Sequence, residues 1–206
     1  MLATRLRENI EECLERLAKR TSVAVCCLLL FATPAFTQNV LYDNGPDADS
    51  GYYWVNCGAQ TTNSFFLSQG AAVTSFTLTI YAVDDRNVPK TLRWTVTSKP
   101  FGGTVLGTGS AGLSGLGQPY LTKFLFFAYK VGFQVPDLEL PSGTYYIQIQ
   151  DVVTHWDTRA FWAASGGPST GYYSQLGPSE YGTRTSPVQI LSESFAVLGS
   201  WAEAAR

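Results

Sequence analysis

Charged residues are scarce in this sequence: Asp, Glu, Lys and Arg make up 15% of the 206 residues, whereas aromatic residues reach 14%. A disordered chain needs high charge and few aromatic residues, so this balance excludes one. A helical bundle is disfavoured because it would be richer in Ala, Glu, Lys and Leu. The formal net charge is −2, and no basic cluster follows the N-terminal region. Electrostatic binding to nucleic acid is therefore not expected.

Histidine and cysteine are also rare. His155 is the only histidine, and three of the four cysteines lie before residue 38. A zinc site is not expected, because His155 and Cys57 would be the only histidine and cysteine of the mature chain. Cys57 cannot form an intramolecular disulfide with a partner in the same domain, and we expect it to be a small buried hydrophobe in a strand. No GxSxG motif accompanies His155, which we expect in an exposed loop between strands.

No apolar run is long enough to span a bilayer comfortably, which takes about 20 residues. The uncharged stretch "SVAVCCLLLFA" at 22–32 follows Lys19 and Arg20 and precedes "TPAFTQ", the layout of a secretory signal peptide. We expect cleavage after Thr37 or after Ala35, and a secreted, extracellular protein without a stable transmembrane span. Residues 1–37 would then be a charged extension plus signal peptide. The alternative is an amphipathic helix packed on the domain.

Residues 38–199 predict one all-β domain, a two-sheet antiparallel sandwich of jelly-roll type. Short runs of alternating β-branched and aromatic residues are separated by turn clusters, which suggests about eight to ten strands. A Gly- and Ser-rich stretch at 102–117 is expected to be a short strand and a loop. Residues 200–206 are expected to be a short C-terminal tail.

Two of these runs predict which residues form the core. In the return strand at 91–98 we expect Trp94 to be buried. The clearest alternation lies at 72–83 and separates two faces. One face carries Phe76, Leu78, Ile80 and Ala82, and the other carries Val73, Ser75, Thr77 and Thr79.

Five stretches within 38–199 carry a resemblance to a known group. They are "LYDNGP", "SKPFGGTVLGTGSA", "LPSGTYYIQIQD", "FWAASGGPS" and "ESFAVLG". Together they resemble exported bacterial β-sandwich proteins, many of which carry a C-terminal sorting segment of the PEP-CTERM kind. The resemblance implies an exported β-sandwich and no particular biochemical activity. No Pro-Glu-Pro motif, apolar span or basic terminus follows Gly199, so we expect free secretion rather than sorting-dependent anchoring.

The stretch "YDNGPDADSGYYWVNCG" at 42–58 brings Asp43, Asp47 and Asp49 close together. Their carboxylate oxygens are of the hard type that calcium prefers, so these residues are a candidate calcium site. The stretch does not match an EF-hand, because no glutamate occupies the twelfth position. The favoured alternative is a surface loop over 43–51, in which Asp and Asn side chains bond to backbone amides.

Aromatic residues close to turns are candidates for ligand contact, and four are singled out: Trp156, Trp162, Tyr172 and Tyr173. Consecutive residues in a strand point to opposite faces, so each pair sends one ring inward and one outward. Outward rings beside polar loops suit the apolar face of a pyranose or a partner protein. The alternative is that these rings fill the core of the sandwich.

These features predict a non-catalytic module that binds carbohydrate, a cell-envelope polymer or another surface. The alternative is a structural cell-surface or matrix protein without a small ligand, whose exposed edges and faces contact other copies. A glycoside-active enzyme is the second alternative, because it needs only two carboxyl groups beside a cleft and no sequence pattern identifies them. No cofactor is expected apart from the candidate calcium ion.

Overall fold

The computed structural model describes residues 38–175 and 187–202. The chain divides into two units, Met1–Thr37 and Gln38–Arg206, and the structure is that of the second. The predicted signal peptide and residues 203–206 of the predicted tail lie outside the described residues. Within the two described ranges, no helix has the length and apolar character that crossing a bilayer requires.

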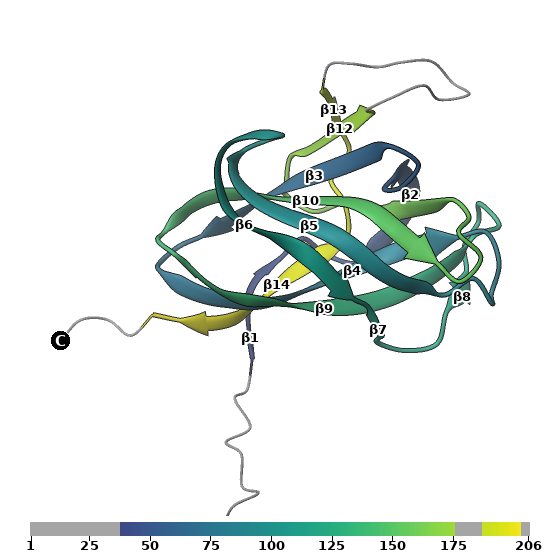
Figure 1. Cartoon of the computed structure of the whole chain (residues 1–206), viewed down its shortest axis with the longest axis horizontal. Coiled ribbons are helices and arrows are strands. Elements are labelled where there is room, and N and C mark those ends of the chain that lie inside the picture. The colour runs from purple at the N-terminus through teal and green to yellow at the C-terminus, as the bar shows by residue number, and fades with distance from the viewer. Residues whose placement is uncertain (1–37, 176–186, 203–206) are drawn as a thin grey trace, which may run out of the picture. The chain divides into compact units, whose positions relative to one another are not determined.

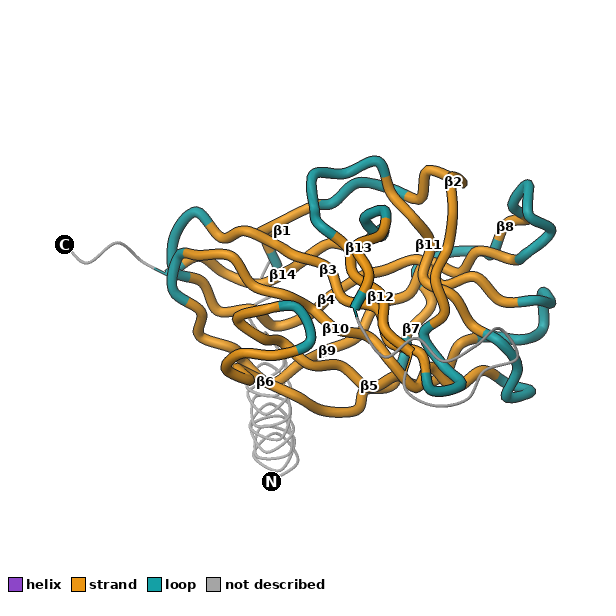
Figure 2. Tube along the Cα trace, turned by 90° about the horizontal axis from the view of Figure 1, so that it is seen from above, coloured by secondary structure: helices purple, strands orange, loops and turns teal. Residues whose placement is uncertain are grey.

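Strands joined by short loops make up the described part of the chain (Figure 2). In chain order they are β1 (Asn39–Asp43), β2 (Asp47–Trp54), β3 (Ala59–Leu67), β4 (Ala71–Ala82), β5 (Pro89–Lys99), β6 (Gly102–Gly112), β7 (Ser114–Gly115), β8 (Tyr120–Leu121), β9 (Phe127–Leu140), β10 (Gly143–Thr154), β11 (Ala160–Ser165), β12 (Gly171–Gln175), β13 (Val188–Ile190) and β14 (Phe195–Trp201).

These strands form two antiparallel sheets, which confirms the predicted all-β sandwich. The eight-stranded sheet runs β1-β14-β4-β11-β2, and β9 joins it by pairing with β4 on one side and with β7 and β8 on the other. The six-stranded sheet has the order β13-β12-β3-β10-β5-β6. In Figure 1, β3, β10, β5 and β6 lie side by side in one layer, and β4, β14 and β9 belong to the other.

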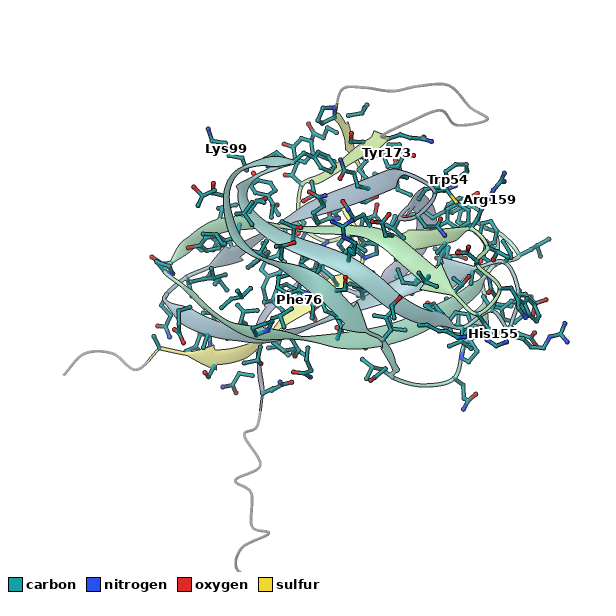
Figure 3. The ribbon with its side chains drawn as sticks, viewed as in Figure 1. Trp54, Phe76, Lys99, His155, Arg159 and Tyr173 are labelled. Atoms are coloured by element: carbon teal, nitrogen blue, oxygen red, sulfur yellow. The ribbon has the colours of Figure 1, made fainter. Side chains whose placement is uncertain are left out.

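The core lies between the two sheets and is built from the inward residues of each strand. Phe76, Leu78 and Ile80 of β4 are buried there, as their alternation predicted. Trp94 is only 2% exposed, which confirms its predicted core position. Figure 3 shows Phe76 near the middle of the ribbon.

Val73 departs from the predicted alternation of β4. It was expected on the hydroxyl-bearing face with Ser75, but it is fully buried in the core. The pairing of β4 with β9 shifts register between Val73 and Ser75. Such a bulge turns the residues before it to the opposite face, so a regular period of two could not predict it.

A second apolar cluster covers the outer side of the eight-stranded sheet. Tyr81, Ala128, Phe161 and Ala163 are buried in it, and Tyr52, Trp54, Phe124 and Phe126 pack against them. As a result every residue of β11 is buried, because one face of the strand packs in the core and the other packs in this second cluster. The segment around β8, residues 116–126, therefore folds over the outer face of β11 and leaves little of that face open to solvent.

Two predicted loops are partly strands. The acidic stretch forms a loop only at 44–46, because β1 ends at Asp43 and β2 begins at Asp47. The Gly- and Ser-rich stretch at 102–117 contains the long strand β6 rather than a short one. Glycines permit this strand to lie closely over Trp94: a Cβ at Gly109 would come 3.2 Å from its indole ring.

Candidate functional site

The acidic stretch first forms two side-chain turns. The Oδ1 atom of Asp43 accepts a hydrogen bond of 2.8 Å from the amide of Gly45. The Oδ1 atom of Asp47 accepts one of 2.8 Å from the amide of Asp49. An aspartate that bonds the backbone two residues ahead stabilises a tight turn. The predicted bonds from Asp side chains to backbone amides are therefore confirmed.

Asp47 also accepts hydrogen bonds from two tyrosines that come from distant parts of the chain. The phenol of Tyr81 lies 2.6 and 2.7 Å from its two carboxylate oxygens. The phenol of Tyr120 lies 2.7 Å from Oδ2. Burial raises the pKa of both phenols, and the hydrogen bond to Asp47 raises it further. Both tyrosines are therefore neutral donors, and Asp47 ties the segment around β8 to the sheet.

The third aspartate binds the same segment. The Oδ2 atom of Asp49 accepts a hydrogen bond of 3.1 Å from the amide of Lys123, while its Oδ1 atom is buried and has no partner among the described residues. Within residues 38–175 and 187–202, no three His, Cys, Asp or Glu side chains gather as a metal cage would need. The contacts give Asp47 and Asp49 a structural role in holding Tyr120 and Lys123.

The four aromatic candidates lie in different environments. Trp162 has no accessible surface, and its indole N–H donates to the carbonyl of Ser194 at 2.9 Å. It is a core residue and offers no surface to a ligand. Trp156 is 46% exposed in the turn after β10, where the Arg86 guanidinium lies 5.1 Å from its ring centroid. The structure does not bring these two rings together.

Tyr172 and Tyr173 face opposite sides of β12, as consecutive strand residues should. The ring of Tyr173 lies 5.8 Å from that of Tyr53. The ring of Tyr172 lies 6.4 Å from that of Tyr146 in β10, and both rings are on the outer side of the six-stranded sheet. Burial raises the pKa of Tyr146, and the proximity of Tyr172 adds to this. Of the four predicted rings, Tyr172 is the one that belongs to an extended polar surface.

This surface, which we call the polar face, is the outer side of the six-stranded sheet. Its members are carried by strands β3, β5, β6, β10 and β12, and the antiparallel register aligns them in rows. They carry amide, hydroxyl, phenol, guanidinium and carboxylate groups. The residues are Gln60, Arg93, Thr95, Thr108, Tyr146, Gln148, Gln150, Asp151 and Tyr172.

One row shows how the register builds the polar face. Arg93 of β5 lies opposite Gln150 of β10, which lies opposite Gln60 of β3. Ser110 of β6 and Ser174 of β12 extend the row at its two ends. Neighbouring strands are about 4.8 Å apart, so the row is about 20 Å long. The inward neighbours, such as Trp94 and Ile149, pack in the core.

Hydrogen bonds connect the side chains of the polar face. The amide nitrogen of Gln148 donates to Gln60 at 2.6 Å and to Gln150 at 2.7 Å. Arg93 donates to Asp151 at 3.0 Å, and Gln150 donates to the same carboxylate oxygen at 3.3 Å. These bonds orient the amides and the guanidinium. Arg93, Gln148 and Gln150 are exposed or half-buried and retain further hydrogen-bonding capacity, which is available to a ligand, whereas Gln60 is buried.

A groove on the outer side of the eight-stranded sheet is a different candidate surface. This groove has a volume of about 470 Å³ and is lined by β4 and β14 on its floor and by the segment around β8 above it. Thr77, Thr79 and Ser194 supply hydroxyls, and Lys130 and Tyr120 lie along it. It is the competing location for a ligand, because it combines polar groups with a hollow shape.

His155, Asp151 and Asp157 do not form a catalytic group. His155 is exposed in the turn after β10, as predicted, and Figure 3 shows it at one end of the ribbon. Asp151 is paired with Arg93. The three residues are close in sequence, but no hydrogen bond or ion pair joins His155 to either aspartate. The arrangement differs from a triad, in which each member bonds the next.

Cys57 was predicted to be a buried strand residue, and this is wrong. It is exposed, carries a free thiol and has a φ of 56° in the turn between β2 and β3. The turn is set by Asn56, whose side chain bonds the carbonyls of Val152 and Thr158. The residue type at position 57 does not reveal these contacts of Asn56, because they join segments that are far apart in the chain.

Glu193 is a buried carboxyl group that the sequence did not indicate. It has no accessible surface, and within the described residues neither of its carboxylate oxygens has a hydrogen-bond partner. Burial raises its pKa well above the ordinary range, and the charge of Asp47 adds to the shift. Because no substrate can reach it, its raised pKa does not make it a candidate catalytic acid.

Most of the polar face was also missed by the reasoning from sequence, which considered aromatic rings and acidic residues. A signal was nevertheless present: in "TYYIQIQD", Tyr146, Gln148 and Gln150 alternate with the core residues Ile147 and Ile149. Comparison with known protein families gives no matching family model for this chain, and no curated protein sequence matches it.

Proposed function

We propose that this protein is a secreted, non-catalytic module that binds carbohydrate on the polar face. The observation that carries the proposal is the group of Arg93, Gln148 and Gln150 on the polar face, in which the buried Gln60 orients the amide of Gln148. Sugars present many hydroxyls that both donate and accept hydrogen bonds. Amide side chains match this chemistry because each offers two donors and an acceptor. Export rests on the signal-like segment before residue 38.

The aromatic pair at one side of the polar face supports the same ligand class. Tyr146 and Tyr172 are half-buried, and each combines an apolar ring with a polar hydroxyl. Such rings suit a pyranose, which has an apolar face and a polar rim. Arg93 and Asp151 form a charged pair with side chains 60% and 45% exposed, so both can exchange their mutual contact for contacts with a ligand.

Binding is favoured over glycoside hydrolysis by the count of carboxyl groups. Hydrolysis uses two carboxyl groups about 5–9.5 Å apart. Asp151 is the only Asp or Glu in the six strands β3, β5, β6, β10, β12 and β13, and Arg93 occupies one of its oxygens. A surface that supplies one carboxylate and several amides is suited to holding a sugar rather than cleaving it.

A glycan-array screen of the purified protein, followed by titration calorimetry of any hit, tests the proposal. We expect Gln148→Ala or Arg93→Ala to weaken binding by about tenfold, because each removes hydrogen bonds to the ligand. The matched control is Gln134→Ala. Gln134 is also an exposed strand glutamine, but it lies on the eight-stranded sheet.

A further variant separates the two candidate surfaces. If Lys130→Ala abolishes binding while Gln148→Ala does not, the ligand occupies the groove instead. If no glycan binds, or if Gln148→Ala and Arg93→Ala leave the affinity unchanged while the fold is intact, the proposal for the polar face is wrong.

A further inference from the structure

Strand β6 (Gly102–Gly112) ends the six-stranded sheet with an unpaired edge. It pairs with β5 on one side, and no strand of residues 38–175 and 187–202 pairs with it on the other. Figure 1 shows it beside β5. The strand has 11 residues, each exposed or half-buried. Its backbone N–H and C=O groups on the free side are therefore open to another strand.

The regular part of β6 shows which backbone groups are free. From Gly107 to Gly112 the pairing with β5 has no register shift. The amide of Leu113 donates to the carbonyl of Lys90 at 2.7 Å, so odd-numbered residues bond toward β5. In an antiparallel ladder the alternate residues point the other way. The backbone groups of Thr108, Ser110 and Gly112 therefore face outward from the sheet.

This edge lacks the charges and prolines that often prevent strands from pairing, and the register shifts of its pairing with β5 lie before Gly107. It contains no charged residue and no proline, and Val105 and Leu106 are exposed within it. The other edges differ: β13 has three residues, β7 and β8 have two each, and β1 and β2 carry Asp43 and the pair Asp47 and Asp49. The part of β9 beyond its pairing with β7 is also an edge, and it contains Pro136 and Glu139. Natural sheets protect exposed edges with short strands, charges or prolines. β6 is both the longest of these edges and free of charge.

The glycines of β6 have a packing reason and do not by themselves explain the missing charges. A Cβ at Gly107 would come 2.6 Å from Leu138 and 3.2 Å from Trp94. Glycine is therefore required on the inner side, where β6 covers the core. No such constraint acts at Thr108 and Ser110, which are exposed on the polar face. A lysine could be accommodated there, yet both positions are small and uncharged.

We propose that β6 pairs antiparallel with β6 of a second copy of this chain. A two-fold axis would place the same uncharged strand on both sides, so no like charges meet. Outward N–H and C=O groups would satisfy one another, and Thr and Ser side chains would form cross-strand pairs. The partner is a second copy because β6 has no charged side chain to attract a foreign peptide of opposite charge, whereas an identical strand is matched to it in length and lack of charge.

Pairing of this kind would join the two six-stranded sheets into one continuous sheet. The two polar faces would then lie side by side and could engage a repeating polymer at two points, which raises avidity. The dimer itself does not depend on carbohydrate binding. Gln148→Ala should weaken glycan binding and leave dimerisation unchanged, so the two proposals can fail separately.

Sedimentation velocity of the purified protein over a range of concentrations tests the proposal. We expect a reversible monomer–dimer equilibrium in the wild-type protein. Ser110→Lys should raise the dimer dissociation constant by about tenfold or more, because symmetry brings both lysines to the paired edge. Ser110→Pro removes one outward N–H without adding charge and should also weaken the dimer.

The matched control is Thr144→Lys, which adds a lysine to the same sheet on the interior strand β10, where Thr144 is exposed. It should dimerise as the wild type does. Circular dichroism and a thermal melt of each variant establish that it is folded. A wild-type protein that stays monomeric up to its solubility limit would overturn the proposal. So would folded Ser110→Lys and Ser110→Pro variants that dimerise normally.

Discussion

The phenol of Tyr120 donates a hydrogen bond to Asp47 at 2.7 Å, although the two residues are 73 positions apart in the chain. The same carboxylate receives the phenol of Tyr81 and the amide of Asp49. Three donors from three segments thus converge on one side chain. This convergence holds the segment around β8 against β11 and explains why a strand with two faces is buried on both.

Asp47→Ala should therefore destabilise the protein by about 1–3 kcal/mol, because it leaves the phenol of the buried Tyr81 without its acceptor. Urea denaturation measures the free energy of unfolding. Asp43→Ala is the matched control: Asp43 is exposed, and among the described residues its side chain accepts only from the amide of Gly45. Its replacement should cost less than about 1 kcal/mol. Equal losses in the two variants would show that the phenol contacts do not stabilise the fold.

Calcium should have no effect on thermal stability. The oxygens of Asp47 are already used by phenols and an amide, and an ion would have to displace these donors. A site occupied at 100 times its dissociation constant would add about 2.7 kcal/mol of stability. Melts in millimolar calcium and in chelator should coincide. A calcium-dependent rise in melting temperature that is lost in Asp47→Ala or Asp49→Ala would instead make this stretch a metal site.

Glu193 should make stability fall as pH rises. Its pKa is raised in the folded protein by burial, and the nearby charge of Asp47 adds to the shift. Above the unfolded pKa of about 4.5, the unfolded chain releases a proton that the native protein keeps. The free energy of unfolding then decreases by up to about 1.4 kcal/mol per pH unit until the native pKa is reached.

The variant Glu193→Gln cannot titrate and should lose this pH dependence. Wild type and variant should be similar in stability near pH 4, and the variant should be the more stable at pH 8. Urea denaturation at several pH values measures the difference. Asp85→Asn is a control, because Asp85 has an exposed side chain. Parallel stability profiles for wild type and Glu193→Gln would contradict a buried, protonated Glu193.

Trp94→Ala should destabilise the protein by about 3–5 kcal/mol, because it leaves a cavity beneath the glycines of β6. Trp156→Ala removes the same side chain from a position that is 46% exposed. That control should change stability by less than about 1 kcal/mol. Chemical denaturation compares the two. A loss below about 1 kcal/mol in Trp94→Ala would mean that the indole does not fill the core.

The amino-acid sequence alone determined the fold class and much of the core. Alternation in β4 placed Phe76, Leu78 and Ile80 between the sheets, and Trp94 was correctly expected beside them. These predictions succeed because a strand's period of two is a local property of the backbone. The turns formed by Asp43 and Asp47 were likewise predictable, since each bonds an amide two residues ahead.

Only the tertiary structure decided what depends on residues far apart in the chain. It assigned Asp47 to Tyr81 and Tyr120, turned Val73 inward through a bulge, and aligned Gln60, Gln148 and Arg93 in one surface. Strand order and register set these neighbours, and no short stretch of sequence records them. The burial of Glu193 and the free edge of β6 have the same origin, because both follow from which strands pair and which do not.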